Sequence, residues 1–247
     1  MTKAGPYTKA PITEALIDFR VELPPEVEVT NLKSIQSDIQ ADYPRSEDLI
    51  TFQSQIQTGP DFTTTASHKT VGCRFLSDDR KQVLQARLDG FAFSRLAPYS
   101  AWEPFRNEAK KLWQVYSAVA QPSSIKRVAV RYINRLDLPL PLEDFKDYLR
   151  TFPELSPDLS QDLADYVMQV IIPERELDSW LMLQEGVVPT PSGVSDVVSI
   201  ALDITLFREP QTPIAEEDAW ELLERFRIRK NDVFEACITN KTRSLFK

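Results

Sequence analysis

Two short echoes between the halves of the chain constrain its fold more than any other feature. Residues 20–24 (RVELP) recur as residues 135–139 (RLDLP), 115 positions later, and residues 101–103 (AWE) recur as residues 219–221, 118 positions later. The echoes occur in the same order and at nearly equal offsets. Because self-similarity at a long period indicates repeated folding units, we predict a tandem duplication. One unit covers residues 1–122 and the other covers 123–247, and together they form one compact domain.

The first half has the pattern of a strand, a helix, three strands and a long helix. Residues 12–23 alternate between apolar and polar side chains, which is typical of a half-buried strand. A short helix capped at Thr30 or Asn31 follows. The long helix begins at Ser100, which has capping-box spacing with Glu103, and ends before Pro122. The further strands are predicted over residues 49–57, 71–76 and 82–95.

The second half repeats this order of elements. A short helix is expected around Phe145, and a long helix starts near Ala215 and is interrupted at Asn231 and Asp232. The strands are predicted over residues 126–138, 165–172, 179–188 and 197–207. Two polar segments, 59–70 and 188–196, occupy corresponding places in the two halves and are predicted to be loops, which carry binding function more often than the scaffold does.

These elements predict an α+β fold with a curved antiparallel sheet of about eight strands. Strands joined by short turns are antiparallel neighbours, and each long helix covers the apolar face of its four strands. Trp102 and Trp220 stand at the same step of the two copies and are expected to anchor the long helices in the core. The plan is that of TBP-like and helix-grip proteins, a topological analogy that does not fix function.

The composition excludes several classes of enzyme. His68 is the only histidine and lies in a polar run that predicts a loop, so sites needing two or three imidazoles are absent. Cys73 and Cys237 are far apart in the sequence and form no C-x-x-C motif, which indicates two buried thiols in a reducing compartment. The six glycines form neither G-x-G-x-x-G nor a P-loop. We therefore expect no metal and no cofactor.

Net charge and hydropathy limit the classes of partner that the sequence favours. The formal net charge is −8, which disfavours nonspecific binding to duplex nucleic acid because phosphate contacts need a basic surface. No apolar run approaches the length of a membrane span, and the first residues lead into no apolar signal segment. We expect a cytoplasmic protein that has a protein partner or forms a homo-oligomer.

Four segments together resemble a known family. They are residues 11–15 (PITEA), 93–105 (FSRLAPYSAWEPF), 131–135 (RYINR) and 238–241 (ITNK). They are similar to a sporadically distributed family of bacterial proteins of about 250 residues, to which no activity is assigned. The resemblance spans nearly the whole chain and implies a bacterial protein, but it gives no catalytic residues to carry over.

The strand face opposite the core is rich in charged residues and carries the candidate site. Arg20 and Arg135 are equivalent under the repeat, and two arginines near a twofold axis can clamp a carboxylate or phosphate. The alternative is a solvated face with cross-strand Arg–Asp pairs. Near the start of the first long helix, Tyr99 can form an aromatic wall beside an anion. The candidate ligand-binding residues are Arg20, Arg95, Tyr99, Arg131, Arg135 and Asp203, with Glu14, Asp18, Arg87 and Asp89 on or beside the same face.

The missing catalytic motifs favour a non-enzymatic binding or regulatory protein that engages a macromolecular partner. By analogy with small acidic bacterial proteins, a defence or toxin–antitoxin accessory role fits. Two alternatives stay open. One is a small-molecule binder with a helix-grip cavity between sheet and long helices. The other is an enzyme that uses arginines and carboxylates on the sheet face.

Overall fold

The computed structural model of the chain describes residues 7–57, 63–160 and 163–247. It contains a single open antiparallel sheet of nine strands in the order β2-β3-β4-β5-β1-β6-β9-β8-β7, so the predicted α+β class is confirmed. The strands are β1 (Ile12–Glu22), β2 (Arg45–Gln57), β3 (Thr63–Leu76), β4 (Gln82–Arg87), β5 (Gly90–Leu96), β6 (Ser124–Pro139), β7 (Val167–Glu174), β8 (Ser179–Val188) and β9 (Val197–Arg208).

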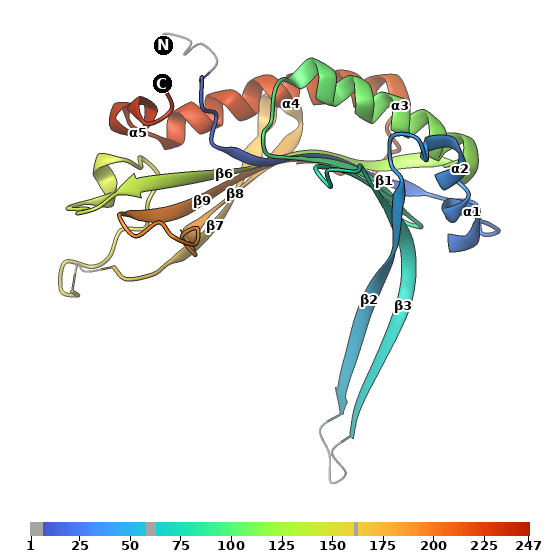
Figure 1. The fold of residues 1–247 in the computed structure, drawn as a ribbon, viewed down its shortest axis with the longest axis horizontal. Coiled ribbons are helices and arrows are strands. Elements are labelled where there is room, and N and C mark those ends of the chain that lie inside the picture. The colour runs from blue at the N-terminus through green and yellow to red at the C-terminus, as the bar shows by residue number, and fades with distance from the viewer. Residues whose placement is uncertain (1–6, 58–62, 161–162) are drawn as a thin grey trace.

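The helices lie on one face of this sheet. They are α1 (Val29–Lys33), α2 (Gln36–Ile39), α3 (Trp102–Ala120), α4 (Glu216–Cys237) and α5 (Asn240–Ser244), with short 3-10 turns η1 (Phe145–Asp147) and η2 (Arg175–Leu177). Figure 1 shows the sheet as an arch with α3 and α4 over its convex side. The β2–β3 hairpin descends as an arm on one flank, and the β7–β9 strands form the other flank.

The nine strands correct the expected eight at one place. The segment predicted as a single strand over 82–95 is two strands, β4 and β5, joined at Leu88 and Asp89. Gly90 starts β5 so close to β1 that an added Cβ would lie 2.2 Å from the Phe19 carbonyl oxygen.

The expected loop at 59–70 is wrong over most of the described part. Residues 63–70 belong to β3, which pairs with β2 along its whole length, so His68 is a strand residue rather than a loop residue. Residues 58–62 lie outside the described part of the chain. The other predicted loop is confirmed, because β8 ends at Val188 and β9 begins at Val197, with Gly193 at a φ of +86° between them.

Three predictions about helix ends are also corrected. The first short helix is capped by Glu28 rather than by Thr30 or Asn31, and Asn31 completes its capping box. α3 begins at Trp102 with Ala101 at its N-cap position, and no side chain caps it. α4 continues without interruption through Asn231 and Asp232 because Val233, Phe234 and Cys237 bury its last turns.

Aromatic side chains fill the space between the sheet and the helices. The Phe19 ring on β1 lies 5.0 Å from the Trp113 ring of α3 and 5.1 Å from the Trp220 ring of α4, as centroid distances. Trp102 and Trp220 are 4% and 7% exposed, so their prediction as core residues is confirmed. Cys73 and Cys237 are buried free thiols, also as predicted. In the described residues no helix is both long and apolar enough to span a membrane.

Candidate functional site

The underside of the arch is a sheet face that none of the described helices covers. Along β1 the side chains of Ala15, Ile17 and Phe19 are buried under the helices, so Asp18 and Arg20 point to the opposite face. A hollow of about 710 Å³ lies there, on the concave side between the β2–β3 arm and β8. Its charged lining residues are Asp18, Arg20, Lys69, Arg87, Asp89, Arg127 and Arg131. Five cations and two carboxylates thus line a hollow in a chain that is acidic as a whole.

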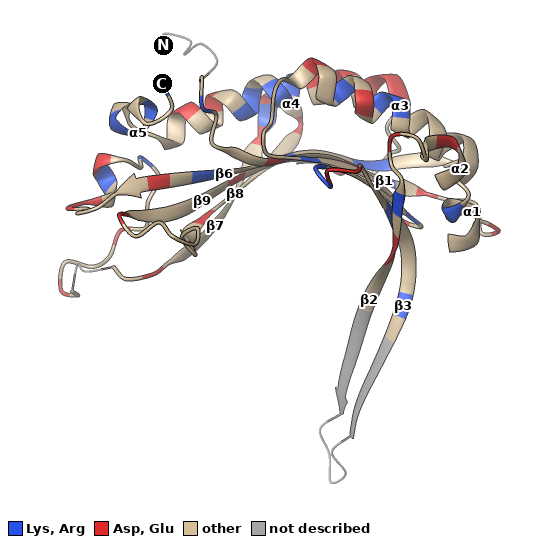
Figure 2. Ribbon diagram, in the orientation of Figure 1, with Lys and Arg blue, Asp and Glu red and all other residues tan. Residues whose placement is uncertain are grey.

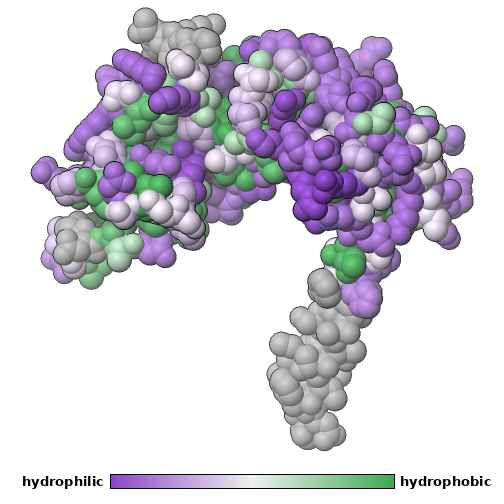
Figure 3. Space-filling view, in the orientation of Figure 1, coloured by the Kyte–Doolittle hydropathy of each residue, from purple (hydrophilic) through white to green (hydrophobic). Residues whose placement is uncertain are grey.

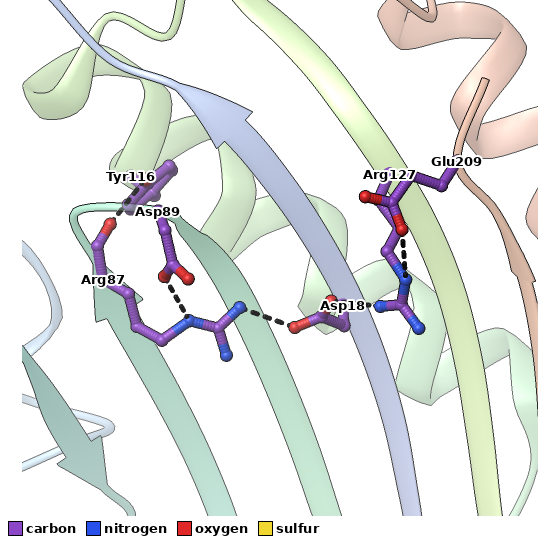
Figure 4. Close-up of polar contacts among 6 residues, drawn as sticks. All are labelled: Asp18, Arg87, Asp89, Tyr116, Arg127 and Glu209. Atoms are coloured by element: carbon purple, nitrogen blue, oxygen red, sulfur yellow. Dashed lines mark hydrogen bonds and ion pairs between the residues drawn. The ribbon is translucent and has the colours of Figure 1, made fainter. Parts of the chain in front are cut away.

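Asp18 on β1 lies at the centre of this face and joins two arginines, one from the adjacent strand β6 and one from β4 on the far side of β5 (Figure 4). The Arg87 Nη2 on β4 donates to Asp18 Oδ2 at 2.6 Å, and the Arg127 Nη1 on β6 donates to Asp18 Oδ1 at 2.9 Å. Asp89 accepts from Arg87 Nε at 3.1 Å, while Glu209 lies 3.9 Å from Arg127 Nε. A single buried carboxylate therefore holds two guanidinium groups.

The positive charges of Arg87 and Arg127 are compensated by neighbouring carboxylates to different extents. Burial alone lowers the pKa of Arg87, but Asp18 and Asp89 outweigh it, so the pKa of Arg87 is raised. Burial also lowers the pKa of Arg127, and there the neighbouring Arg20 adds to the lowering, so that Asp18 does not restore it. Positive charge is therefore in excess on the β1–β6 side of Asp18.

Arg20 is the source of this excess. It lies directly opposite Arg127 in the β1–β6 pairing, and like charges placed opposite each other across a sheet are destabilising. Its side chain is exposed, and within the described residues it has no hydrogen bond or ion pair. Lys69 on β3 is likewise exposed, and its side chain is unpaired in the described part of the chain. Figure 2 shows both basic and acidic positions along the upper part of the β2–β3 arm.

A second charged pair stands beside the hollow. Arg131 Nε donates to Asp203 Oδ2 at 2.8 Å, and its Nη2 donates to the same carboxylate, which raises the pKa of Arg131. Next to Arg131 in the strand register is Thr205, whose Oγ1 is buried without a hydrogen-bond partner in the described residues. Thr205 lines the hollow but is only 4% exposed.

The predicted Arg20–Arg135 clamp does not form. Because β1 and β6 are antiparallel, Arg20 faces Arg127, and Arg135 lies eight residues further along β6, roughly 26 Å away. There the Arg135 Nε donates to Asp137 at 2.8 Å, and its Nη2 donates to Ser199 Oγ at 2.7 Å. A clamp would need the two arginines to lie opposite each other in this pairing, and they do not.

Arg95 and Tyr99 lie on the other side of the sheet. Arg95 is in phase with the buried Phe91 and Phe93 of β5, so it is on the helix-covered face at the sheet's margin, and its assignment to the charged face was wrong. The Tyr99 hydroxyl lies 3.0 Å from the Tyr132 hydroxyl among core rings, and burial raises the pKa of Tyr99 to about 12. Neither residue belongs to the hollow.

The carboxylates considered for acid–base or metal chemistry are engaged in ion pairs where they lie near the hollow. Asp18, Asp89 and Asp203 each accept from an arginine. Across the described ranges, no group of three or more histidine, cysteine, aspartate or glutamate side chains has the arrangement of a metal site. Glu14, on the same face of β1 as Asp18, has no ion pair within the described residues, but it does not line the hollow. The arrangement around the hollow can bind an anion, and both carboxylates that line it are paired with arginines.

The flank of the concave face formed by β7 and β8 is apolar. Trp180 and Ile171 are 46% and 54% exposed, and their positions in the register share the face of Met182. Figure 3 shows more hydrophobic residues on the second-half side of the arch as a whole than on the first-half side, which is mainly hydrophilic. The hollow therefore joins a cationic centre to an apolar margin.

Two residues of this site were missed from the sequence. Arg127 has the same strand phase as Arg131, which was selected, so the alternation alone would have found it. Lys69 was assigned to a loop, because the polar composition of its segment hid the strand.

No protein-family model matches the chain, and no curated protein matches it significantly.

Proposed function

We propose that the chain is a non-enzymatic binding or regulatory protein that engages a macromolecular partner through the concave face of its sheet. The observation that carries this proposal is the hollow beneath the arch, which draws its lining from β1, β2, β3, β4, β6, β8 and β9. A surface that spans most of a nine-stranded sheet suits a partner of macromolecular size. The opposite face is already covered by α3 and α4 (Figure 1).

The alternatives have less support. A helix-grip ligand would need space between the sheet and the long helices, where the rings of Phe19, Phe91, Trp113 and Tyr116 are in mutual contact. An enzyme would need a carboxylate free to exchange protons within the hollow, and the two carboxylates that line it, Asp18 and Asp89, are paired with arginines. We therefore place function on the uncovered sheet face and on binding.

The proposal includes the tandem duplication. The strand order β3-β4-β5-β1 in the first half is repeated as β7-β8-β9-β6 in the second, and each half ends in a long helix. The arm strand β2 has no counterpart in this scheme. If two equivalent units form the arch, their approximate axis passes between β1 and β6 at the hollow, so the binding face is a product of the fusion. The resemblance to a bacterial family is consistent with a cytoplasmic accessory role.

Co-purification from the native host tests the proposal. We compare the wild-type chain with the double variant Arg20→Gln/Lys69→Gln and with the matched control Arg80→Gln/Lys81→Gln. The control removes two exposed cations from the β3–β4 turn and leaves the hollow intact. The proposal predicts a partner that co-purifies with the wild type and the control, and that is lost from the double variant.

Two results would contradict this function. One is a monodisperse monomer with no partner in any preparation. The other is a partner that remains bound to the double variant, since its contact would then lie elsewhere on the molecule.

A further inference from the structure

We propose that the hollow beneath the arch accepts a protein segment in which aspartate or glutamate side chains alternate with aliphatic ones. The inference rests on the proposed function and names the chemistry of the partner. Its basis is the combination, on one uncovered surface, of cations that have no partner among the described residues and an apolar floor between them.

The unpaired cations require an anion. Arg20 and Arg127 face each other across β1 and β6, and Asp18 is shared between Arg127 and Arg87. An incoming carboxylate beside Arg20 would replace a repulsive pair by an attractive arrangement. Lys69 provides a second, separate point of positive charge on the arm. Since arginine binds carboxylates with two parallel hydrogen bonds, Arg20 is suited to a single Asp or Glu side chain.

The floor between these charges is apolar. Leu16, Val71, Ala129 and Met182 line the hollow among the cations. In the strand register, Leu16 neighbours Arg131, and Met182 neighbours Thr205, whose Oγ1 has no partner in the described part of the chain. A segment with aliphatic side chains between its carboxylates would bury this floor.

The observations favour a peptide over a nucleic acid. The hollow of about 710 Å³ has room for a few side chains, and the chain as a whole carries a net charge of −8. A long phosphodiester backbone would leave the hollow and meet acidic surface, which opposes binding. A segment with a few carboxylates places its charge where the cations are.

The test uses defined probes on the full-length protein. We titrate a dodecapeptide of alternating Glu and Leu, its Gln–Leu counterpart, and a twelve-nucleotide oligothymidylate, and measure each affinity by calorimetry at two salt concentrations. We expect the Glu–Leu peptide to bind at least about tenfold more tightly than the other two probes, and to weaken as salt rises. In Arg20→Gln/Lys69→Gln its affinity should fall about tenfold, and in Arg80→Gln/Lys81→Gln it should change less than twofold.

Three outcomes would overturn the inference. Equal binding of the Gln–Leu peptide would show that charge does not select the ligand. Tighter binding of the oligothymidylate, lost in the same double variant, would assign the hollow to single-stranded nucleic acid. Unchanged peptide affinity in the double variant would move the site off the hollow. Neither variant removes a partner of a described residue, so loss of fold does not confuse the result, and thermal unfolding checks this.

The failure of this inference is distinguishable from the failure of the proposed function. If co-purification of the native partner depends on Arg20 and Lys69 but the Glu–Leu peptide does not bind, the proposed acidic segment is wrong. The proposal that the concave face binds a partner is then still supported. If neither the native partner nor any probe depends on Arg20 and Lys69, both fail.

Discussion

Buried carboxylates on the two faces of the sheet have different surroundings. On the face covered by α3 and α4, a carboxylate without an arginine is driven towards its neutral form. Glu185 of β8 is 2% exposed, accepts a hydrogen bond from Tyr166 at 2.8 Å, and has a pKa raised by burial to about 7. On the concave face, Asp18 is nearly as buried but is paired with two arginines. The same sheet therefore has one face built for packing and one built around fixed charges.

This difference between the two faces indicates that the concave face is the one used for binding. The covered face contains the large aromatic contacts that hold the molecule together. The concave face keeps charged groups at a cost in stability, with Arg20 opposite Arg127. Groups that do not contribute to stability and are nevertheless ordered together are best explained by binding.

The largest expected effect comes from the covered face. Phe19→Ala removes a fully buried ring that contacts the rings of Phe91, Trp113 and Trp220, and should lower the free energy of unfolding by about 3–5 kcal/mol. Trp180→Ala on the concave face, where the ring is half-exposed, should cost less than about 1 kcal/mol. Urea denaturation of both variants makes the comparison. Equal losses would mean that the concave face also holds the fold together.

Breaking the charge network at its centre should have the next largest effect. Asp18→Asn leaves two mostly buried guanidinium groups without their shared carboxylate, which we expect to cost about 3 kcal/mol of unfolding free energy. Asp89→Asn is the control, because its carboxylate is 70% exposed and its pair with Arg87 should be worth less than about 1 kcal/mol. If Asp18→Asn is as stable as the wild type, the network is solvated and does not position the arginines.

The buried acid of the covered face should appear in the pH dependence of stability. The pKa of Glu185 is about 7 in the folded chain and about 4.5 when unfolded, so folding favours the protonated form. Its stabilising contribution is present below pH 4.5 and is lost as the pH rises to about 7, by an amount on the order of 2–3 kcal/mol. Glu185→Gln should remove this part of the loss. Parallel pH profiles of unfolding for the two proteins would contradict the assignment.

The smallest effect is expected to have the opposite sign. Arg20→Gln removes a like charge opposite Arg127 and breaks no contact in the described residues, so stability should rise by a few tenths of a kcal/mol at low salt. The gain should shrink as salt screens the repulsion. Arg80→Gln controls for net charge. A loss of stability in Arg20→Gln would show that Arg20 has a structural partner and is not held for binding.

The sequence predicts the scaffold better than the site. Alternation in β1 correctly places Phe19 under the helices and Asp18 on the other face, and the two tryptophans are found as core residues. The same rule would have put Arg95 with Phe93 on the covered face and Arg127 with Arg131 on the concave face. For Arg95 and Arg127, strand alternation in the sequence is therefore sufficient to predict the correct face.

Other features of the site depend on long-range pairing that no local pattern contains. Asp18 bonds to Arg127 across 109 positions, and their contact is fixed only when the register of β1 against β6 is known. The same register separates Arg20 from Arg135, although sequence equivalence suggested a clamp. The length of β3 was also hidden, because its threonine-rich first half becomes a strand through pairing with β2.

The most direct test of the account is to ask which face of the sheet touches another molecule in the native host. A photo-crosslinking residue replaces Gln85, which lines the hollow, or Gln114, which is exposed on α3. The account predicts a discrete crosslinked product from position 85 and none from position 114. A product from position 114 alone, or from neither position, would contradict a binding role for the concave face.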